Sequence, residues 1–409
     1  MGEPSTPIDV LIFGGGVAGM WLLDELLRQN CRALLLENHS LGRGQTVGSQ
    51  GIIHGGLKYM FSGQLTPAAK MVSEMPAIWR DALAGRIAPD LSGTTVRSDH
   101  CYIWGTGSIK SRIFMAGSTI ALRTAPEPVE KSDWPPALAN ISGKVLRVPE
   151  QVIDPRSMMH RLADLTRGYV AHVDHASPPS FEQDATGKVL TVRVRLQTGE
   201  DLTLRPTNVV LSAGEGNATL RDHLRLPSTT MQRRPLHMLM VRGKLPPLYG
   251  HCVGGPRPRI TVTTTVDSQG RTVWQVGGQI AEDGVNRSRA QLALHAREEL
   301  PACVPGLDLS AAEFSSYRVD RAEAATTTGQ LPDDVHIVQE ANVITAWPTK
   351  LALAPRLAER VVQKLIESPA RAWTKPPPRV APASLGLDLP APPIAQPPWE
   401  TETEWIAAR

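Results

Sequence analysis

The first residues whose types and spacing suit ligand binding are three glycines, followed later in the chain by a glutamate. Gly14-x-Gly16-x-x-Gly19 stands between an apolar run and a helix-like segment, and Glu37 ends the next apolar run. Gly14 permits a tight turn, Gly16 allows a pyrophosphate close to the backbone, and Gly19 allows close helix packing. The amides at the helix start attract phosphate, and Glu37 accepts ribose hydroxyls. The pattern predicts a dinucleotide site and leaves FAD and NAD open.

The elements around this pattern form a strand–helix–strand unit. Residues 8–13 and 32–37 read as buried strands, and 17–29 carry helical apolar spacing. Later in the chain we expect strands over 170–176, 189–196 and 202–205, a buried strand over 208–214, and an antiparallel sheet over 231–280 with a turn at 267–270. A further strand is expected over 335–344, and helices are expected over 66–84, 155–167, near 286–299 and 351–367.

A second glycine-rich stretch, residues 42–56, contains six glycines and several side chains that donate hydrogen bonds. Gln45, Thr46, Ser49 and Gln50 can donate to phosphate or ring oxygens. A flexible surface loop is the alternative, but the adjacent Ile52 and Ile53 favour burial.

Four segments together resemble the D-amino-acid-oxidase superfamily, nearest its glycerol-3-phosphate and L-2-hydroxyglutarate dehydrogenase branch. They are residues 44–57 (GQTVGSQGIIHGGL), 152–157 (VIDPRS), 211–214 (LSAG) and 349–355 (TKLALAP). The resemblance spans residues 8–367 and implies FAD covered by a separate antiparallel sheet. It implies that FAD is held by Gly14, Gly16, Val17, Ala18, Gly19, Glu37, Asn38, Gln45, Thr46, Ser49, Gln50, Gly51, Ala176, Ala213, Gly214, Thr349, Lys350 and Leu351.

His54 follows the two isoleucines and is our first candidate for catalysis. An imidazole titrates near neutrality, so His54 can take a proton from a substrate hydroxyl or amine. In the dimethylglycine dehydrogenases, which this pattern resembles, a histidine in this loop is joined covalently to the flavin. A structural histidine that only orients the loop is the third possibility.

Lys350 is the second catalytic candidate. Relatives usually carry a glycine-rich turn here, whereas this chain has Pro348, Thr349 and Lys350. A lysine can stabilise negative charge on the reduced flavin beside N1 and O2. The alternative is a solvated lysine at a helix start.

Three residues of the expected substrate sheet are candidates for substrate binding. The resemblance implies an arginine near Arg318 or Arg321 that holds a substrate carboxylate. In a strand these two side chains point to opposite faces, so we expect only one to reach the substrate. Surface ion pairs are the alternative for both. His251 lies between glycines, which favour close approach of a ligand, although strand histidines are usually structural.

Composition excludes other classes. The net charge is +3, with no basic run, so we expect no nucleic-acid partner. The four cysteines show no metal or disulfide spacing, and no apolar run is long enough to cross a membrane. We expect a cytoplasmic protein with no integral membrane segment, while peripheral membrane contact stays open. Motifs of hydrolases, zinc proteases and P-loop nucleotidases are absent.

The predicted fold is α/β (α+β): a Rossmann-type FAD-binding domain with a discontinuous antiparallel-sheet substrate domain. We assign 1–84, 146–225 and 315–368 to the FAD domain and 85–145 and 226–314 to the substrate domain. Residues 369–409 form a tail, and nine prolines lie within 376–398. These prolines favour an extended tail that wraps the surface or is partly disordered.

The predicted function is an FAD-dependent oxidoreductase. It would oxidise a C–OH bond, or a C–N bond, of a small anionic substrate by hydride transfer to flavin N5, with quinone or oxygen as electron acceptor. An amine or imino-acid oxidase of the same fold is the first alternative. A flavin-binding protein without turnover is the second, and a flavin monooxygenase is a further possibility.

Overall fold

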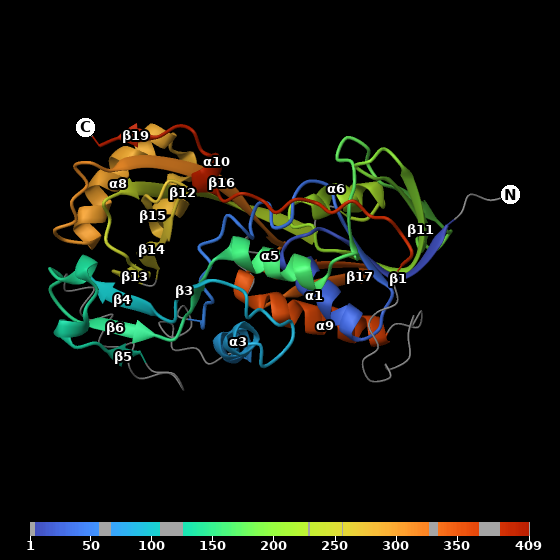
Figure 1. Cartoon of the computed structure of the whole chain (residues 1–409), viewed down its shortest axis with the longest axis horizontal. Coiled ribbons are helices and arrows are strands. Elements are labelled where there is room, and N and C mark those ends of the chain that lie inside the picture. The colour runs from blue at the N-terminus through green and yellow to red at the C-terminus, as the bar shows by residue number, and fades with distance from the viewer. Residues whose placement is uncertain are drawn as a thin grey trace.

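The computed structural model describes residues 5–56, 67–106, 126–227, 230–255, 257–326, 334–367 and 385–408 (Figure 1). Two large sheets organise these residues. The first carries the dinucleotide fingerprint, and the second lies at the other end of the molecule in Figure 1. This arrangement agrees with the predicted α/β fold.

The first sheet has eight strands, and its centre is parallel. β1 (Thr6–Phe13) lies between β2 (Ala33–Glu37) and β11 (Asp201–Leu211), and all three run parallel. The outer strands are β8 (Val170–His172), β18 (Val343–Trp347), β17 (His336–Glu340), β10 (Val189–Arg195) and β9 (Ser180–Gln183). β1 and β2 are buried and apolar, as expected of strands covered on both faces.

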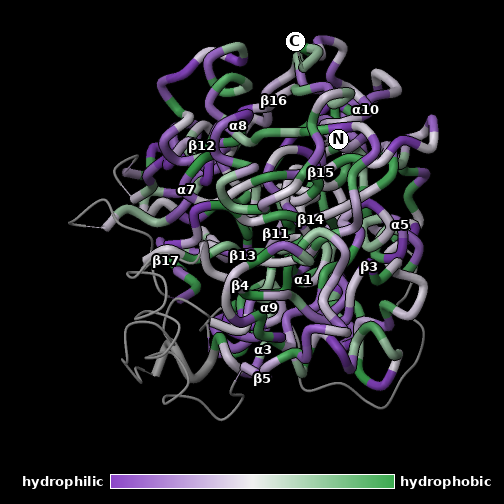
Figure 2. The backbone as a smooth tube through the Cα atoms, turned by 90° about the vertical axis from the view of Figure 1, so that its left-hand side faces the viewer, coloured by the Kyte–Doolittle hydropathy of each residue, from purple (hydrophilic) through white to green (hydrophobic). Residues whose placement is uncertain are grey.

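Helices cover one face of this sheet. α1 (Val17–Arg28), α5 (Pro155–Leu165) and α9 (Ala354–Glu367) pack together there, with α3 (Pro67–Leu83) beside them (Figure 1). The hairpin of β9 and β10 covers part of the other face, and α6 (Gly216–His223) follows β11. Figure 2 shows the apolar segments towards the middle of the molecule and the hydrophilic ones on its outer loops.

The second sheet has nine strands and is antiparallel except where β4 meets β13. Its order is β19 (Ile406–Ala407), β16 (Glu313–Ala324), β12 (Met231–Gly243), β15 (Thr272–Gly277), β14 (Pro258–Val266), β13 (Gly250–Val253), β4 (Cys101–Gly105), β6 (Val145–Val148) and β5 (Glu127–Pro128). α7 (Gln279–Asp283) and α8 (Arg289–Cys303) pack on one face. A separate two-stranded ribbon pairs β3 (Val96–Ser98), which precedes β4 in the chain, with β7 (Val152–Ile153), which follows β6.

Three expected boundaries differ from the structure. The strand expected over 335–344 is two strands, β17 and β18, joined by a turn at Ala341 and Asn342. The strands expected over 202–205 and 208–214 are one strand, β11. β16 pairs with β12 up to Ala324, so the second sheet extends past the predicted domain boundary at 314.

The described part of the C-terminal tail is packed against both sheets. Leu41 exchanges backbone hydrogen bonds with Pro393 and Ala395, at 2.8 and 3.0 Å. Trp399, in α10 (Pro398–Thr401), is buried, and β19 adds an edge strand to β16. The tail, red in Figure 1, therefore spans the molecule. None of the helices in the described ranges combines the length and apolar character needed to cross a bilayer.

Candidate active site

The turn after β1 has the geometry that the glycine fingerprint predicts. Gly14 has a φ of +107°, and a Cβ atom there would lie 2.4 Å from Ala213 Cα. A Cβ at Gly19 would lie 2.1 Å from the Gly14 carbonyl oxygen, so α1 packs too closely on the turn for any side chain. At Gly16 a Cβ would approach only Thr46 Oγ1, at 3.3 Å. The first and third glycines are therefore steric requirements, and the second leaves the backbone accessible to a phosphate.

The start of α1 is suited to binding an anion. The helix begins after Gly16, which has no side chain to cap it, and the Val17 amide donates to Thr46 Oγ1 at 3.2 Å. Val17 and Ala18 are buried in the first turn. A helix start with glycine at its cap presents amides and the positive end of the helix dipole. Thr46 from the second glycine loop thus lies beside the predicted pyrophosphate site.

Glu37 lies at the end of β2, next to the same turn. Its carboxylate accepts hydrogen bonds from the Gly15 amide at 2.7 Å and from the His39 amide at 2.8 Å. Burial raises the pKa of Glu37, and the amide hydrogen bonds oppose the rise. Asn38 follows it and is exposed, and Ala176 lies in the turn after β8, which pairs with β2 at Glu37. Glu37, Asn38 and Ala176 thus lie at or after the ends of two paired strands, at the same end of the sheet, and an adenosine site there stays a prediction.

The second glycine loop is anchored on the second sheet. Gln50 Nε2 donates to the carbonyl oxygens of Thr261 and Gln275, at 2.9 and 2.8 Å. Gln45 Oε1 accepts from the Ala322 amide at 3.2 Å, and Ser49 Oγ donates to the Thr46 carbonyl at 2.8 Å. The side chains predicted to donate to FAD therefore also hold this loop, and the Gln50 amide is turned to the second sheet.

The turn around Lys350 keeps the conformation that glycine favours. Thr349 has a φ of +61°, a left-handed value that is uncommon for a threonine. Among the residues that the structure describes, the buried side-chain oxygen of Thr349 has no hydrogen-bond partner, and neither has the indole nitrogen of Trp347. Lys350 and Leu351 lead into a short 3₁₀ turn ahead of α9. The Thr349 hydroxyl is therefore available to hydrogen-bond a bound group.

Two predicted histidines meet at one buried carboxylate. Glu150 Oε2 lies 3.3 Å from His54 Nδ1 and 3.4 Å from His251 Nε2. The Gly55 amide donates to Glu150 Oε1 at 2.7 Å. The side chain of His54 is 40% exposed, whereas those of His251 and Glu150 are each 3% exposed. His54 thus faces the accessible side of the cluster.

Glu150 was not among the predicted site residues. It directly precedes Gln151 and β7, and the pairing of Ile52 with Val152 brings it opposite His54. Burial raises the pKa of Glu150, but the adjacent imidazoles of His54 and His251 outweigh it, so the net pKa lies well below its usual range. No local pattern marks this carboxylate, because its partners lie about a hundred residues away on either side.

The two arginines point to opposite faces of β16, as expected. Arg318 donates to the carbonyl oxygens of Val285 and Arg287, at 2.8 and 3.1 Å, and it is exposed. Arg321 lies on the same face as Tyr317 and is 3.5 Å from Glu282. Tyr317 contacts the glycine loop at Gly48. Of the two, Arg321 therefore lies on the face of the sheet that the loop contacts.

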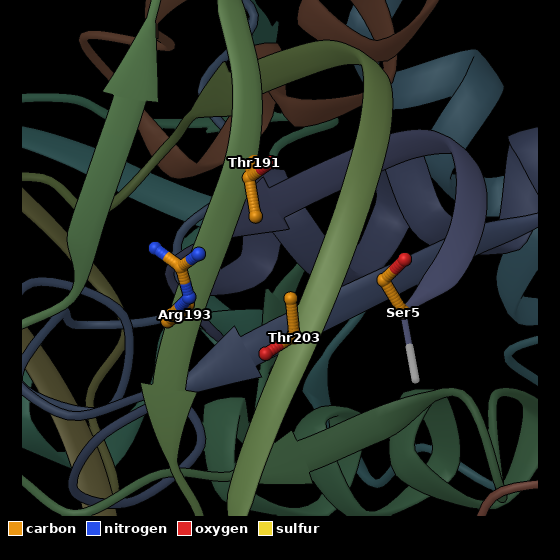
Figure 3. Close-up of a pocket in the computed structure, with 4 residues that line it drawn as sticks. All are labelled: Ser5, Thr191, Arg193 and Thr203. Carbon is orange, nitrogen blue, oxygen red and sulfur yellow. The ribbon is translucent and has the colours of Figure 1, made fainter. Parts of the chain in front are cut away.

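Two cavities lie apart from these groups. One, of about 460 Å³, is lined by Ser5, Thr191, Arg193 and Thr203, and Figure 3 shows it beside β10 and β11. The other, of about 320 Å³, lies between residues 154–156, the turn at 265–268 and the tail at 396–400. Val47 of the glycine loop lines the second cavity, and the residues that line the two cavities include none of the predicted site residues.

The glycine turn and the carboxylate at the end of β2 are typical of a dinucleotide-binding protein, and the comparison of this sequence with protein families shows which family it belongs to. The family of FAD-dependent oxidoreductases known as DAO matches residues 9–356, so this chain belongs to that family. The cofactor of this family is FAD. The predictions of an oxidoreductase and of FAD are therefore confirmed.

Individual proteins agree with this assignment. A probable FAD-dependent oxidoreductase of Pseudomonas aeruginosa is 40% identical over 397 residues, which cover 96% of this chain and 97% of that protein. The crystal structure of a P. aeruginosa FAD-dependent oxidoreductase superposes with a TM-score of 0.80 at 37% identity and covers 97% of this chain and 99% of its own.

More distant structures share the fold. The FAD-bound L-α-glycerophosphate oxidase of Mycoplasma pneumoniae has a TM-score of 0.65 and 16% identity, over 94% of this chain and 99% of that one. The glycine oxidase of Geobacillus kaustophilus has a TM-score of 0.61 and 16% identity, over 88% and 94%.

The residues of this chain fit FAD. Three features support the fit: the glycine turn before α1, the carboxylate at the end of β2, and the buried Thr349 hydroxyl without a partner. They lie at the positions that the fingerprint and the resemblance assign to pyrophosphate, ribose and flavin.

Proposed function

We propose that this oxidoreductase oxidises the C–OH bond of a small anionic substrate, as a dehydrogenase of the hydroxy-acid or glycerol-3-phosphate type. The observation that carries the proposal is the half-exposed ring of His54, with its Nδ1 atom 3.3 Å from the buried carboxylate of Glu150. This pairing resembles the carboxylate–histidine pair that supports a general base in other enzymes.

A positioned base distinguishes alcohol from amine oxidation. An alcohol that loses hydride to FAD must also lose its hydroxyl proton, because the product is a neutral carbonyl. An amine needs a base earlier, to convert its ammonium form to the free amine, and the free amine then becomes an iminium ion on loss of hydride without losing a further proton at that step. The His54–Glu150 pair therefore favours the C–OH substrate.

In this proposal, one residue accepts the substrate proton and another binds the substrate anion. His54 Nε2 accepts the hydroxyl proton, and Glu150 stabilises the imidazolium that forms. Bound FAD supplies the acceptor for the hydride, and quinone or oxygen receives the electron pair in the complete reaction. Arg321 is our candidate for the substrate anion, because it lies on the face of β16 that contacts the glycine loop. Lys350 is our candidate for stabilising the negative charge of the reduced cofactor.

Anaerobic substrate screening tests the proposal. The FAD-loaded protein is mixed with glycerol 3-phosphate, 2-hydroxy acids, and amino and imino acids, and the visible flavin absorbance is followed. We expect bleaching by an anionic alcohol, and a rate that falls about 10²–10⁴-fold in His54→Gln. His160→Gln, an exposed histidine on α5, is the matched control and should bleach at the wild-type rate.

Other outcomes select the alternatives. Bleaching by amines alone, with peroxide formed in air, would identify an amine or imino-acid oxidase. The similarity of this fold to that of a glycine oxidase is compatible with that alternative. Absence of bleaching with every compound, together with NAD(P)H consumption, would identify a monooxygenase. Colour that stays with acid-precipitated protein would make His54 a covalent anchor and remove it as the base.

A further inference from the structure

The cluster around Glu150 contains a second imidazole that the proposed reaction does not use. His251 Nε2 faces the same carboxylate oxygen as His54 Nδ1, at nearly the same distance, 3.4 against 3.3 Å. The two ring centroids are 5.8 Å apart. His251 Nδ1 lies 3.0 Å from Thr261 Oγ1 on the neighbouring strand. The polar groups of His54, Glu150, His251 and Thr261 therefore form a row that runs inward, in which the contact of His251 Nε2 with the carboxylate is at ion-pair distance without hydrogen-bond geometry.

We propose that Glu150 and His251 are positioning residues that fix the tautomer of His54 and set its basicity through their shared carboxylate. The inference rests on the proposed function only in giving His54 the role of proton acceptor. The arrangement of the three side chains does not depend on that role.

The tautomer follows from the charge of Glu150. An ionised carboxylate only accepts hydrogen bonds, so the imidazole nitrogen facing it must carry the proton. Glu150 Oε1 already accepts from the Gly55 amide, and Oε2 faces His54 Nδ1. His54 Nδ1 therefore holds its hydrogen, and Nε2 presents its lone pair towards the accessible side.

The basicity of His54 depends on how the two imidazoles share the negative charge of Glu150. Glu150 is buried, and in the described part of the chain its ion-pair contacts are to the two imidazoles. Without His251, the full negative charge of Glu150 would support a proton on His54. With His251 facing the same carboxylate oxygen, less of that charge is available to His54.

Other groups adjoin the cluster and must be considered. Arg80 of α3 donates to the Pro149 carbonyl at 3.5 Å, next to Glu150. The thiol of Cys101 on β4 is buried, and burial and the Glu150 charge raise its pKa. Because the thiol stays neutral, it contributes no charge to the cluster, and Arg80 is a constant positive charge.

A metal ion is the competing explanation. Adjacent ligands of a tetrahedral zinc ion with bonds of about 2.0–2.1 Å lie about 3.4 Å apart, which resembles the spacing here. The same three side chains are close enough to share an ion. The exposed His54 ring and the amide bound to Oε1 favour the hydrogen-bonded pair, and the test separates the two explanations.

The test measures His54 directly and needs no substrate. FAD-loaded protein with ¹³C,¹⁵N-labelled histidine rings is titrated by NMR, and the His54 signals are assigned with His54→Gln. We expect Nδ1–H in the neutral ring. Glu150→Gln should lower the titration midpoint of His54 by at least about one pH unit, because it removes the neighbouring negative charge. His251→Phe should raise that midpoint, since the carboxylate then serves His54 alone.

Opposite shifts from two buried neighbours cannot come from a merely structural role. His251→Gln keeps a polar side chain and should give a smaller rise, which provides a second measurement if the Phe variant does not fold. Unchanged midpoints in the Glu150 and His251 variants would overturn the inference. Stoichiometric zinc in the purified protein would overturn it too. If the midpoints shift but His54→Gln still turns over substrate normally, the inference stands and the proposed function fails.

Discussion

Tyr317 donates its phenolic hydroxyl to the carbonyl oxygen of Gly48 across 2.7 Å, although 269 positions separate the two residues in the chain. This buried hydrogen bond joins β16 of the second sheet to the glycine loop that follows the first βαβ unit. Gln275 Nε2 donates to the same carbonyl at 3.1 Å and also contacts the Tyr317 hydroxyl. Two buried side chains of the second sheet thus hold the same carbonyl group of the loop.

Replacing this hydroxyl should destabilise the loop. Tyr317→Phe leaves the Gly48 carbonyl with one donor fewer and should lower the free energy of unfolding by about 1–3 kcal/mol. FAD affinity should fall as well, because the loop carries Thr46 to the start of α1. Denaturant unfolding and fluorescence titration with FAD measure both effects. Tyr102→Phe, on β4 of the same sheet, is the control, and an equal loss there would contradict the special role of Tyr317.

Two glycines of the fingerprint should respond differently to alanine. Gly19→Ala places a Cβ 2.1 Å from the Gly14 carbonyl oxygen and should cost about 3 kcal/mol or more, because backbone must move. Gly16→Ala meets only Thr46 Oγ1 at 3.3 Å, so the protein should fold with nearly wild-type stability but bind FAD more weakly. Thermal unfolding of the protein without FAD, followed by FAD titration, distinguishes the two. Equal loss of stability in both variants would refute this assignment.

The local parts of the fold could be predicted from the sequence. Periodic apolar spacing gave the strand–helix–strand unit, and glycine spacing indicated the cofactor turn. The place of His54 in the second glycine-rich stretch and the glycine neighbours of His251 indicate both histidines as candidates. Their meeting at Glu150 could not be predicted, because it depends on the long-range pairing of Ile52 with Val152 and on the register of β13.

The missed turn between β17 and β18 has a similar cause. Ala341 has a φ of +49°, a left-handed conformation that alanine adopts rarely. Because the turn has alanine where glycine is usual, the sequence contains no local signal for it. The buried side chain of Asn342 stabilises it. That side chain accepts from the Val189 amide at 2.8 Å and donates to the Val189 and Thr207 carbonyl oxygens, at 2.9 and 3.0 Å. Tertiary hydrogen bonds thus replaced the usual local signal.

Asp154 should make the free energy of unfolding depend on pH in the acidic range. It caps α5 by accepting from the amides of Arg156 and Ser157, at 2.8 and 3.0 Å, and it pairs with Arg97 at 2.7 Å. Burial raises the pKa of Asp154, but the Arg97 charge and these amides outweigh it, so its net pKa lies below the ordinary value.

Because the folded pKa of Asp154 is depressed, its contribution is present above the unfolded value of about 3.9 and is lost as the pH falls through the folded value. At neutral pH, Asp154→Ala should lower the free energy of unfolding by about 1–2 kcal/mol. The difference from wild type should shrink below about pH 4. Denaturant unfolding from pH 3 to 7 measures it. Asp164→Ala, at an exposed position of α5, is the control. A difference that grows in acid would contradict the prediction.

The C-terminal tail should be required for both stability and cofactor binding. Residues 393–395 hydrogen-bond Leu41, whose neighbour Gly42 donates to the Gly15 carbonyl at 2.8 Å in the fingerprint turn. Trp399 is buried against Met238 and Tyr317 of the second sheet, and Arg97 lies 5.5 Å from its ring centroid. Removal of the tail therefore exposes apolar surface and frees the backbone that follows β2.

A chain ending at residue 384 should lose about 5 °C or more in Tm, since it gives up the Trp399 contacts, and it should bind FAD more weakly. A chain ending at Glu402 keeps Leu41 and Trp399 packed and removes β19 together with the Glu404 and Trp405 contacts to the second sheet and α8, so it should bind FAD as the full chain does. Thermal unfolding with and without FAD compares the two. Equal FAD affinity in all three chains would show that the tail stabilises the second sheet alone, because the hydrogen bonds to Leu41 would then have no effect on the cofactor turn.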